Sequence, residues 1–245
     1  MKAVMLAAGV GVRMGAESTG PPKVMLRFGG RSLLDRHIEI LQAVGVDELV
    51  LGVGYQAEVI ESEIAGLGAE AFVRTVFNPR YEEGSLLTML ALGEAMGGGD
   101  VLLMDGDVLY DRRLMQRLMA SRHRNCFLID QDFEPGDEPV KLCLRDGAIV
   151  DFHKKVGDID FDSCGESVGF FRFEPAVAVE ILAAGEAHAA AGRHDLWYEE
   201  AIRDVLLEAP NRFGYEDITG LPWIEIDFPE DIRRAESEVL PRLSD

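Results

Sequence analysis

The 245-residue chain has few cysteines and no long hydrophobic run. Its cysteines, Cys126, Cys143 and Cys164, lie far apart and include no Cys-x-x-Cys pair, so we expect neither a disulfide framework nor a structural zinc site. Free thiols make a reducing, cytoplasmic setting the default expectation. No stretch approaches the 18 or so apolar residues that a membrane span needs. The apolar run after Lys2 ends in a glycine-rich turn rather than a cleavage site, which argues against a signal peptide.

Positive charge is also scarce. Lys and Arg number 24 against 44 Asp and Glu, which gives a net charge of −20. So acidic a chain would repel a phosphate backbone, which argues against nucleic acid as a partner. Any polyanionic substrate must therefore meet a local basic patch and a metal ion. With 47% hydrophobic residues the chain can nevertheless bury a full core.

The first thirty residues combine a strand, a glycine-rich turn and a basic loop. The apolar run 1–8 is short enough for a strand covered on both faces. Gly9 and Gly11 follow it, and glycines let backbone N–H groups approach a phosphate because no Cβ stands in the way. Arg13 and Lys23 supply fixed positive charge. We therefore predict a triphosphate cradle, whose nucleotide-binding residues are Leu6, Ala7, Ala8, Gly9 and Gly11.

Other glycine motifs fit this turn less well. In a dinucleotide fingerprint the third glycine would come one place earlier, and an acidic residue would end the second strand. Pro21 and Pro22 also break the helix that such a fingerprint requires. The Gly-Lys-Ser/Thr of a Walker loop is absent.

The first half alternates strands and helices, which indicates right-handed crossovers and a parallel sheet. After residue 110 the pattern changes to strands around an Asp146-Gly147 turn and then an Ala-rich helix, which indicates a mixed addition to an open sheet. We predict strands at 1–8, 48–53, 71–77, 100–104, 126–130, 140–144, 149–153, 166–173, 212–218 and 224–226, and helices at 33–44, 57–64, 86–96, 111–121, 175–191, 196–207 and 229–240.

Two acidic motifs follow short apolar strands. Asp107 comes after 101–104, and Asp227 comes after 223–226. Ligands of open α/β sheets collect outside the carboxyl ends of strands, where the Gly9 turn also lies. Two carboxylates within about 4 Å would repel by roughly 4 kcal/mol at an effective dielectric of 20, unless a proton or cation came between them. Carboxylate and triphosphate oxygens suit Mg²⁺. The alternative is that Asp105, Asp107 and Asp227 only cap the turns and helices that follow.

These residues carry a resemblance to a known family. The segment Leu6-Ala-Ala-Gly-Val-Gly-Val-Arg13, then Pro22-Lys23 and 26–34, resembles the signature of the nucleotidyltransferases that make NDP-sugars and CDP-alcohols. The resemblance implies that the glycine loop binds a nucleoside triphosphate and that Arg13 and Lys23 stabilise its phosphates. It also implies that Asp107 and Asp227 hold Mg²⁺.

The resemblance covers nearly the whole chain and implies its architecture. The expected fold is a three-layer α/β fold with an open, mixed, mainly parallel sheet of the Rossmann-like (GT-A) type and a small antiparallel substrate-side addition. We expect a single domain. Residues 1–125 form a nucleotide-binding half and 126–218 a substrate-side half. Residues 219–245 bring the second metal-binding Asp back to the site and end in a final helix. Family members are often dimers, so a homodimer is compatible with the resemblance.

The nucleotide base is expected near Gly84 and Ser85. The run Asn78-Pro-Arg-Tyr81 to Gly84-Ser-Leu86 is similar to the cytidylyltransferase branch, which acts on small phosphorylated alcohols such as phosphocholine, phosphoethanolamine, aminoethylphosphonate and inositol phosphate. We therefore favour CTP, with Asp105 as a further nucleotide-side residue. Ser85 can equally serve as a helix cap.

The acceptor side is expected to carry carboxylates beside aromatic rings. The segments 165–170 and 197–201 resemble parts shared by that branch, which singles out Glu166, Tyr198 and Glu199. Carboxylates pair with an ammonium group, and Trp197 or Tyr198 offers a π face. Lys141 and Lys154 are candidates to hold the acceptor phosphate. The alternative is a solvated acidic helix face.

Together these features predict a Mg²⁺-dependent cytidylyltransferase. It would transfer CMP from CTP to a small phosphorylated alcohol, aminoalcohol or phosphonate and release pyrophosphate. Two alternative functions, an NDP-sugar pyrophosphorylase and a molybdenum-cofactor nucleotidyltransferase, would use the same chemistry. Two others, a non-catalytic nucleotide sensor and a dinucleotide oxidoreductase, would not. A sensor is expected to lose Lys23 or a metal-binding Asp, whereas all three are present.

Overall fold

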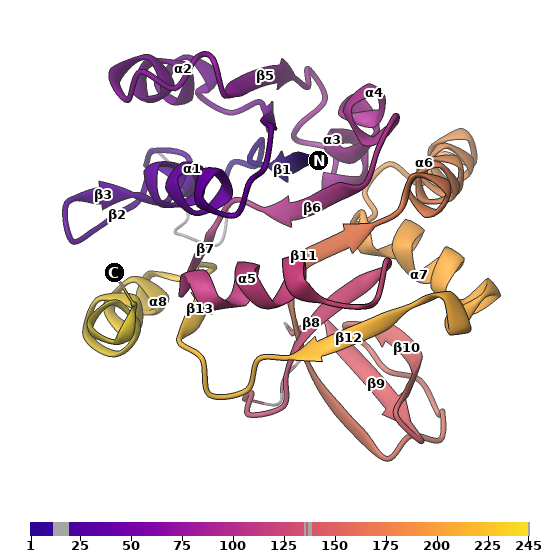
Figure 1. The fold of residues 1–245 in the computed structure, drawn as a ribbon. Helices are drawn as coiled ribbons and strands as arrows, with labels where there is room; N and C mark the ends of the chain where they lie inside the picture. Colours follow the sequence, from indigo (N-terminus) through magenta and orange to yellow (C-terminus); the bar gives the residue numbers. More distant parts are fainter. Residues whose placement is uncertain (12–19, 135, 137–138, 245) are drawn as a thin grey trace.

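The computed structural model describes residues 1–11, 20–134, 136 and 139–244, so the predicted phosphate ligand Arg13 lies outside the described residues. A nine-stranded sheet forms the middle of the molecule (Figure 1). Its main path runs β10-β9-β11-β6-β1-β4-β5, and off this path β8 pairs with β11 and β12 pairs with β8. The strands are β1 (Lys2–Leu6), β4 (Glu48–Val53), β5 (Val73–Phe77), β6 (Val101–Asp105), β8 (Cys126–Asp130), β9 (Lys141–Arg145), β10 (Ala148–His153), β11 (Ser163–Phe173) and β12 (Gly214–Asp217).

The sheet is mixed, as predicted. β1 pairs in parallel with β4 and β6, and β4 pairs in parallel with β5. β11 then runs antiparallel to β6, β8 and β9. β1 is paired on both edges, and helices cover both faces of the sheet, so its apolar residues Ala3 to Leu6 are buried.

Helices cover both faces of the sheet. Alternate residues of β1 enter two separate apolar clusters: Ala3 and Met5 pack under α1, α2 and α5, whereas Val4 and Leu6 pack under α3, α4, α6 and α7. This alternation produces the three predicted layers. The helices are α1 (Leu33–Ala43), α2 (Ala57–Gly66), α3 (Ser85–Ala91), α4 (Gly93–Met96), α5 (Arg112–Ala120), α6 (Pro175–Ala190), α7 (Glu199–Glu208) and α8 (Pro229–Arg234). None of them is long and apolar enough to cross a membrane.

Two short ladders complete the described part of the chain. β7 (Val108–Tyr110) pairs antiparallel with β13 (Trp223–Glu225), and β2 (Arg27–Phe28) pairs with β3 (Arg31–Ser32). The first ladder joins the segment after β6 to the C-terminal segment, although more than 100 residues separate them in sequence. It therefore brings the two predicted metal-binding motifs to the same place.

Several predicted boundaries were wrong. The helix predicted at 86–96 is two helices, α3 and α4, that divide beside Gly93, a poor helix former. The last helix is α-helical only to Arg234 and then continues as a π-helical turn at Ala235–Val239 and a 3-10 turn at Leu240–Arg242. The helix predicted from 196 starts at Glu199, and β1 ends at Leu6, two residues early. β2, β3 and β7 were not predicted, because strands of two or three residues leave no periodic pattern.

Candidate active site

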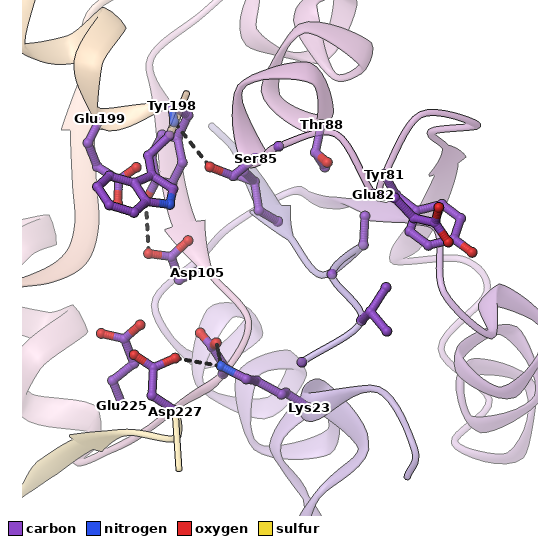
Figure 2. A pocket seen from close by; sticks show the side chains of 18 of the residues that line it. Lys23, Tyr81, Glu82, Ser85, Thr88, Asp105, Tyr198, Glu199, Glu225 and Asp227 are labelled. Carbon is purple, nitrogen blue, oxygen red and sulfur yellow. Dashed lines mark hydrogen bonds and ion pairs between the residues drawn. The ribbon is translucent and has the colours of Figure 1, made fainter. Parts of the chain in front are cut away.

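The carboxyl ends of β1 and β6 open into a pocket of about 410 Å³ (Figure 2). Leu6 and Asp105 stand opposite each other in the register of these strands, so the loops that follow them leave the sheet side by side. This is the edge at which open α/β sheets collect ligands. Most of the predicted residues in the described ranges line this pocket: Leu6, Ala8, Gly9, Gly11, Lys23, Gly84, Ser85, Asp105, Asp107, Lys154, Tyr198, Glu199 and Asp227. Ala7 lines a smaller hollow beside it, with Gly9 and Lys23.

The ammonium group of Lys23 lies between the two predicted metal ligands. Its Nζ donates to Oδ2 of Asp107 at 3.0 Å and to Oδ1 of Asp227 at 2.7 Å. Burial alone would lower the pKa of Lys23, but the charges of Asp107 and Asp227 outweigh it and raise that pKa above its ordinary value. Lys23 therefore stays cationic and holds together two carboxylates that would otherwise repel each other.

A third carboxylate joins this pair. One oxygen from each of Asp107, Glu225 and Asp227 falls within 4.8 Å of the other two. Three hard oxygen donors at this spacing fit Mg²⁺, which binds proteins through carboxylates and keeps water or phosphate oxygens as its other ligands. Sequence reasoning missed Glu225, although its position two residues before Asp227 on a short strand would place both side chains on the same face.

Backbone hydrogen bonds set the positions of the two aspartates. The Ile226 N–H donates to the carbonyl of Asp107 at 2.9 Å, which joins the two motifs directly. Asp231 accepts from the N–H groups of Asp227 and Phe228 at 3.0 and 2.7 Å, at the start of α8. The predicted alternative, that Asp227 is itself a helix cap, is wrong, because Phe228 occupies the cap position and Asp231 makes the capping contacts.

The glycine loop borders the same pocket. Gly11 adopts φ 67°, a left-handed conformation that suits glycine. A Cβ on Gly9 would meet no atom within 4 Å, so its backbone faces open space. The two glycines therefore leave room for an anion to approach the main chain.

The opposite wall of the pocket joins the start of α3 to the segment before α7. Gly84 precedes the helix, and a Cβ there would lie 2.5 Å from the carbonyl oxygen of His194. The Ser85 hydroxyl accepts from the N–H of Tyr198 at 3.1 Å, and the Leu86 N–H donates to the carbonyl of Leu196 at 3.2 Å. Ser85 is thus not the helix cap, and its hydroxyl connects the predicted base side of the pocket to the predicted acceptor side (Figure 2).

Half-buried carboxyl groups line the pocket between the predicted nucleotide and acceptor sides. Burial, together with the neighbouring charges of Glu199 and Asp107, raises the pKa of Asp105 well above its usual range. Burial also raises the pKa of Glu199 to about 7 and that of Glu225 well above its usual value. One oxygen of Glu199 is buried without a hydrogen-bond partner in the described structure. This wall therefore favours a cation or hydrogen-bond donors.

Aromatic groups stand beside this acidic wall. The Tyr198 hydroxyl donates to Oδ2 of Asp105 at 2.9 Å, and the side chain is only 2% exposed, so little of its ring faces the pocket. Trp197 is 43% exposed, and Nζ of Lys154 lies 4.4 Å from the centroid of its ring. The Lys154 ammonium therefore makes a cation–π contact with the indole ring.

Two predicted acceptor residues lie outside the main pocket. The Lys141 ammonium donates to the carbonyls of Gly136, Pro139 and Lys154, which satisfy its three donors. Glu166 lines a neighbouring hollow of about 570 Å³ that shares Glu225 and Asp227 with the main pocket. Burial and the charge of Asp130 raise the pKa of Glu166 to about 7. For both residues, contact with the substrate stays a prediction.

A known protein family matches the part of the chain that contains the glycine loop and Lys23. The model of the MobA-like NTP transferase domain matches residues 3–160. This chain belongs to that family of nucleotidyltransferases. The matched residues include the β1 loop, Lys23 and Asp107, whereas Glu225 and Asp227 come from the segment beyond it.

Relatives of this nucleotidyltransferase align along nearly its whole length. It is 28% identical over 254 residues to the CMP-5'-(3-aminopropyl)phosphonate synthase of Streptomyces rubellomurinus, covering 98% of this chain and 39% of the relative. It is 29% identical over 242 residues to the bifunctional IPC transferase and DIPP synthase of Rubrobacter xylanophilus, covering 97% of this chain and 52% of the relative. The chain therefore spans about half or less of the length of these relatives.

A solved structure shares the fold. The CTP:phosphocholine cytidylyltransferase of Streptococcus pneumoniae superposes with a TM-score of 0.74 at 21% identity, covering 96% of this chain and 97% of that one. The nucleotidyltransferase fold inferred from the sequence is thereby confirmed.

Proposed function

We propose that this nucleotidyltransferase is a Mg²⁺-dependent cytidylyltransferase that transfers CMP from CTP to a small phosphorylated or phosphonate acceptor and releases pyrophosphate. The observation that carries the proposal is the convergence of the glycine loop, Lys23, Asp107 and Asp227 at one end of the sheet. Family membership and the names of the relatives support the same reaction type.

The chemistry asks for alignment and charge neutralisation. An acceptor oxygen forms a bond to the α-phosphorus, the bond from that phosphorus to the bridging oxygen breaks, and the electron pair leaves on pyrophosphate. The acceptor is already an anion, so no general base is required. The Gly9 to Gly11 backbone holds the triphosphate, and the Lys23 ammonium neutralises charge that develops on it.

Asp107, Glu225 and Asp227 would hold the metal ion, which when bound supplies positive charge to phosphate oxygens. The Lys23 ammonium occupies the space beside the same oxygens. We therefore expect its ammonium to turn from the aspartates toward the triphosphate in the loaded enzyme, because two cations at one carboxylate pair repel each other.

The acceptor that fits best carries an amine. Asp105 and Glu199 form an acidic wall to which an ammonium group would donate hydrogen bonds, and the Trp197 face lies beside it. An aminoalkyl phosphonate or aminoalcohol phosphate brings this charge, whereas inositol phosphate or a sugar phosphate does not. The relative named for an aminopropylphosphonate supports this class of acceptor.

The direct test is a pyrophosphate-release assay on the full chain with Mg²⁺. CTP, UTP, GTP and ATP are each paired with aminoalkyl phosphonates, phosphoethanolamine, phosphocholine, inositol phosphate and glucose 1-phosphate. We expect the highest kcat/KM with CTP and an amine-bearing acceptor, and loss of turnover in Asp107→Asn but not in the exposed control Asp160→Asn. Preferred turnover of a sugar phosphate with UTP, GTP or ATP would overturn the proposal in favour of an NDP-sugar pyrophosphorylase. Binding of nucleotide with no turnover of any acceptor would indicate a sensor.

A further inference from the structure

We propose that His37 is a positioning residue, which holds the turn that carries Asp107 and thereby sets the metal affinity of the site. The proposal rests on the proposed function, because it requires that Asp107 binds a metal ion. His37 itself lies in α1 and is not among the described residues that line the pocket.

The imidazole is completely buried and hydrogen-bonded on both sides of Asp107. Its Nε2 lies 3.1 Å from the carbonyl oxygen of Gly106, and its Nδ1 lies 3.4 Å from the hydroxyl of Tyr110. A carbonyl oxygen can only accept, so Nε2 carries the proton. Nδ1 is then the acceptor, and Tyr110 donates to it. His37 therefore contacts the residue before Asp107 and the strand after it.

These contacts leave the Gly106–Asp107 peptide little freedom. The Gly106 N–H donates to the carbonyl of Leu6 at 3.1 Å, and the Asp107 carbonyl accepts from Ile226 at 2.9 Å. These two bonds hold the peptides on either side, and His37 holds the carbonyl of the Gly106–Asp107 peptide itself, whose plane also contains the Asp107 nitrogen. The plane of this peptide determines the direction in which the Asp107 side chain leaves the main chain, and so the spacing of its oxygens from those of Asp227.

The surroundings of His37 make a purely apolar residue the expected choice. Its neighbours on the same face of α1, Leu34, Ile38 and Leu41, are all buried and apolar. Burial lowers the pKa of His37 to about 4, so the ring is neutral at physiological pH and can serve as a fixed donor. The alternative is a purely structural role, in which His37 only donates a hydrogen bond to a buried carbonyl and contributes to stability. The two interpretations differ in what they predict for metal binding by the folded protein.

A matched pair of substitutions separates them. His37→Gln places an amide donor near the position of Nε2, whereas His37→Met has a similar length and no donor. Water proton relaxation measures the dissociation constant of Mn²⁺–CTP from the protein for wild type and both variants. Circular dichroism and thermal melting check that each protein is folded. We expect His37→Met to weaken binding about 10- to 100-fold, the usual loss when a partner of a metal ligand is removed. We expect His37→Gln to remain close to wild type.

Equal affinities in folded wild type, Gln and Met variants would overturn the proposal and leave His37 a purely structural role. Failure of the wild type itself to bind Mn²⁺–CTP would instead refute the proposed function. A second measurement does not depend on the variants: nitrogen-15 NMR of the histidine rings in wild type. We expect His37 in the Nε2–H tautomer, and we expect its ring nitrogen resonances to shift when Mg²⁺ and CTP are added. The control is His188, which is also buried and is bonded to Asp204 at 2.8 Å; its resonances should not shift. An Nδ1–H tautomer, or no shift, would also overturn the proposal.

Discussion

Gly169 and Asp105 approach so closely that a Cβ atom on Gly169 would lie 2.2 Å from Oδ2 of Asp105. Gly169 has φ 77° at an irregularity of β11, where the pairing with β8 shifts between Ser167 and Phe171. The same carboxyl oxygen accepts the hydrogen bond from Tyr198. The missing side chain at 169 thus makes room for a buried carboxyl group at the edge of the pocket.

Gly169→Ala should therefore destabilise the protein by about 2 to 4 kcal/mol, because the left-handed conformation and the clash with Asp105 both oppose a methyl group. Denaturant unfolding measures the loss. The matched control is Gly147→Ala, since Gly147 has a similar φ of 75° but no atom within 4 Å of the added Cβ. We expect about 1 to 2 kcal/mol there, from backbone strain alone. Equal losses in the two variants would contradict the argument from the clash.

Lys23→Ala should lower turnover by on the order of 10² to 10³, the scale of losing one preorganised donor. The substitution also leaves Asp107 and Asp227 without the cation that now lies between them. Steady-state pyrophosphate release measures the effect, with Lys155→Ala as the control because Lys155 is exposed. Essentially unchanged turnover would remove Lys23 from the mechanism.

The buried Glu199 should make stability depend on pH. Its pKa rises from 4.5 to about 7 on folding because of burial. Between these values the folded state keeps a proton that the unfolded state releases, so this contribution is fully present below pH 4.5 and is lost as the pH rises through 7. The free energy of unfolding should fall over this interval by up to on the order of 3 kcal/mol.

Melting curves from pH 5 to 8 test this dependence. Glu199→Gln should make the fall smaller, because the amide does not titrate, while Glu166 and the other carboxyl groups with raised pKa values keep the rest of it. Glu208→Gln, at the exposed end of the same helix, should leave it as in wild type. A profile unchanged by Glu199→Gln would show that Glu199 does not carry the effect.

Trp197→Leu should raise KM for an amine-bearing acceptor roughly 5- to 10-fold, because a cation over an exposed indole face gains about 1 kcal/mol. KM for CTP and for a polyol phosphate should change little, which separates loss of cation binding from general damage. Leu207→Ala, another exposed apolar residue near α7, serves as the control. Equal effects on amine and polyol acceptors would count against an ammonium site at this ring.

Much of the fold could be predicted from the sequence because its strands and helices have strong local patterns. The strands 48–53 and 126–130 were predicted to the residue. They are continuous apolar segments bounded by turn residues, so a short window is enough to find them. The two-residue strands β2 and β3 were missed because they are too short to show a periodic pattern. The ladder of β7 with β13 was missed because it joins segments far apart in the chain.

Some residues of the candidate site could likewise be predicted from the sequence, and others could not. The glycine turn, Lys23 and the two aspartates could be proposed from residue type and position after a strand. Glu225 was not found: its spacing from Asp227 is a weak signal among the many acidic residues of a chain with net charge −20. Lys141 was proposed as a phosphate ligand, but its ammonium faces three backbone carbonyls that no local pattern reveals.

The sequence by itself determined the order of the elements and the parallel first half of the sheet, since periodicity encodes these properties, and its resemblance to a family implied the three layers. Only the tertiary structure decided which charged groups meet. Lys23 and Asp227 are 204 positions apart, and they come within 2.7 Å because a short ladder returns the C-terminal segment to the sheet edge. Such distances depend on register and on the close approach of strands, which neighbouring residues in the chain do not specify.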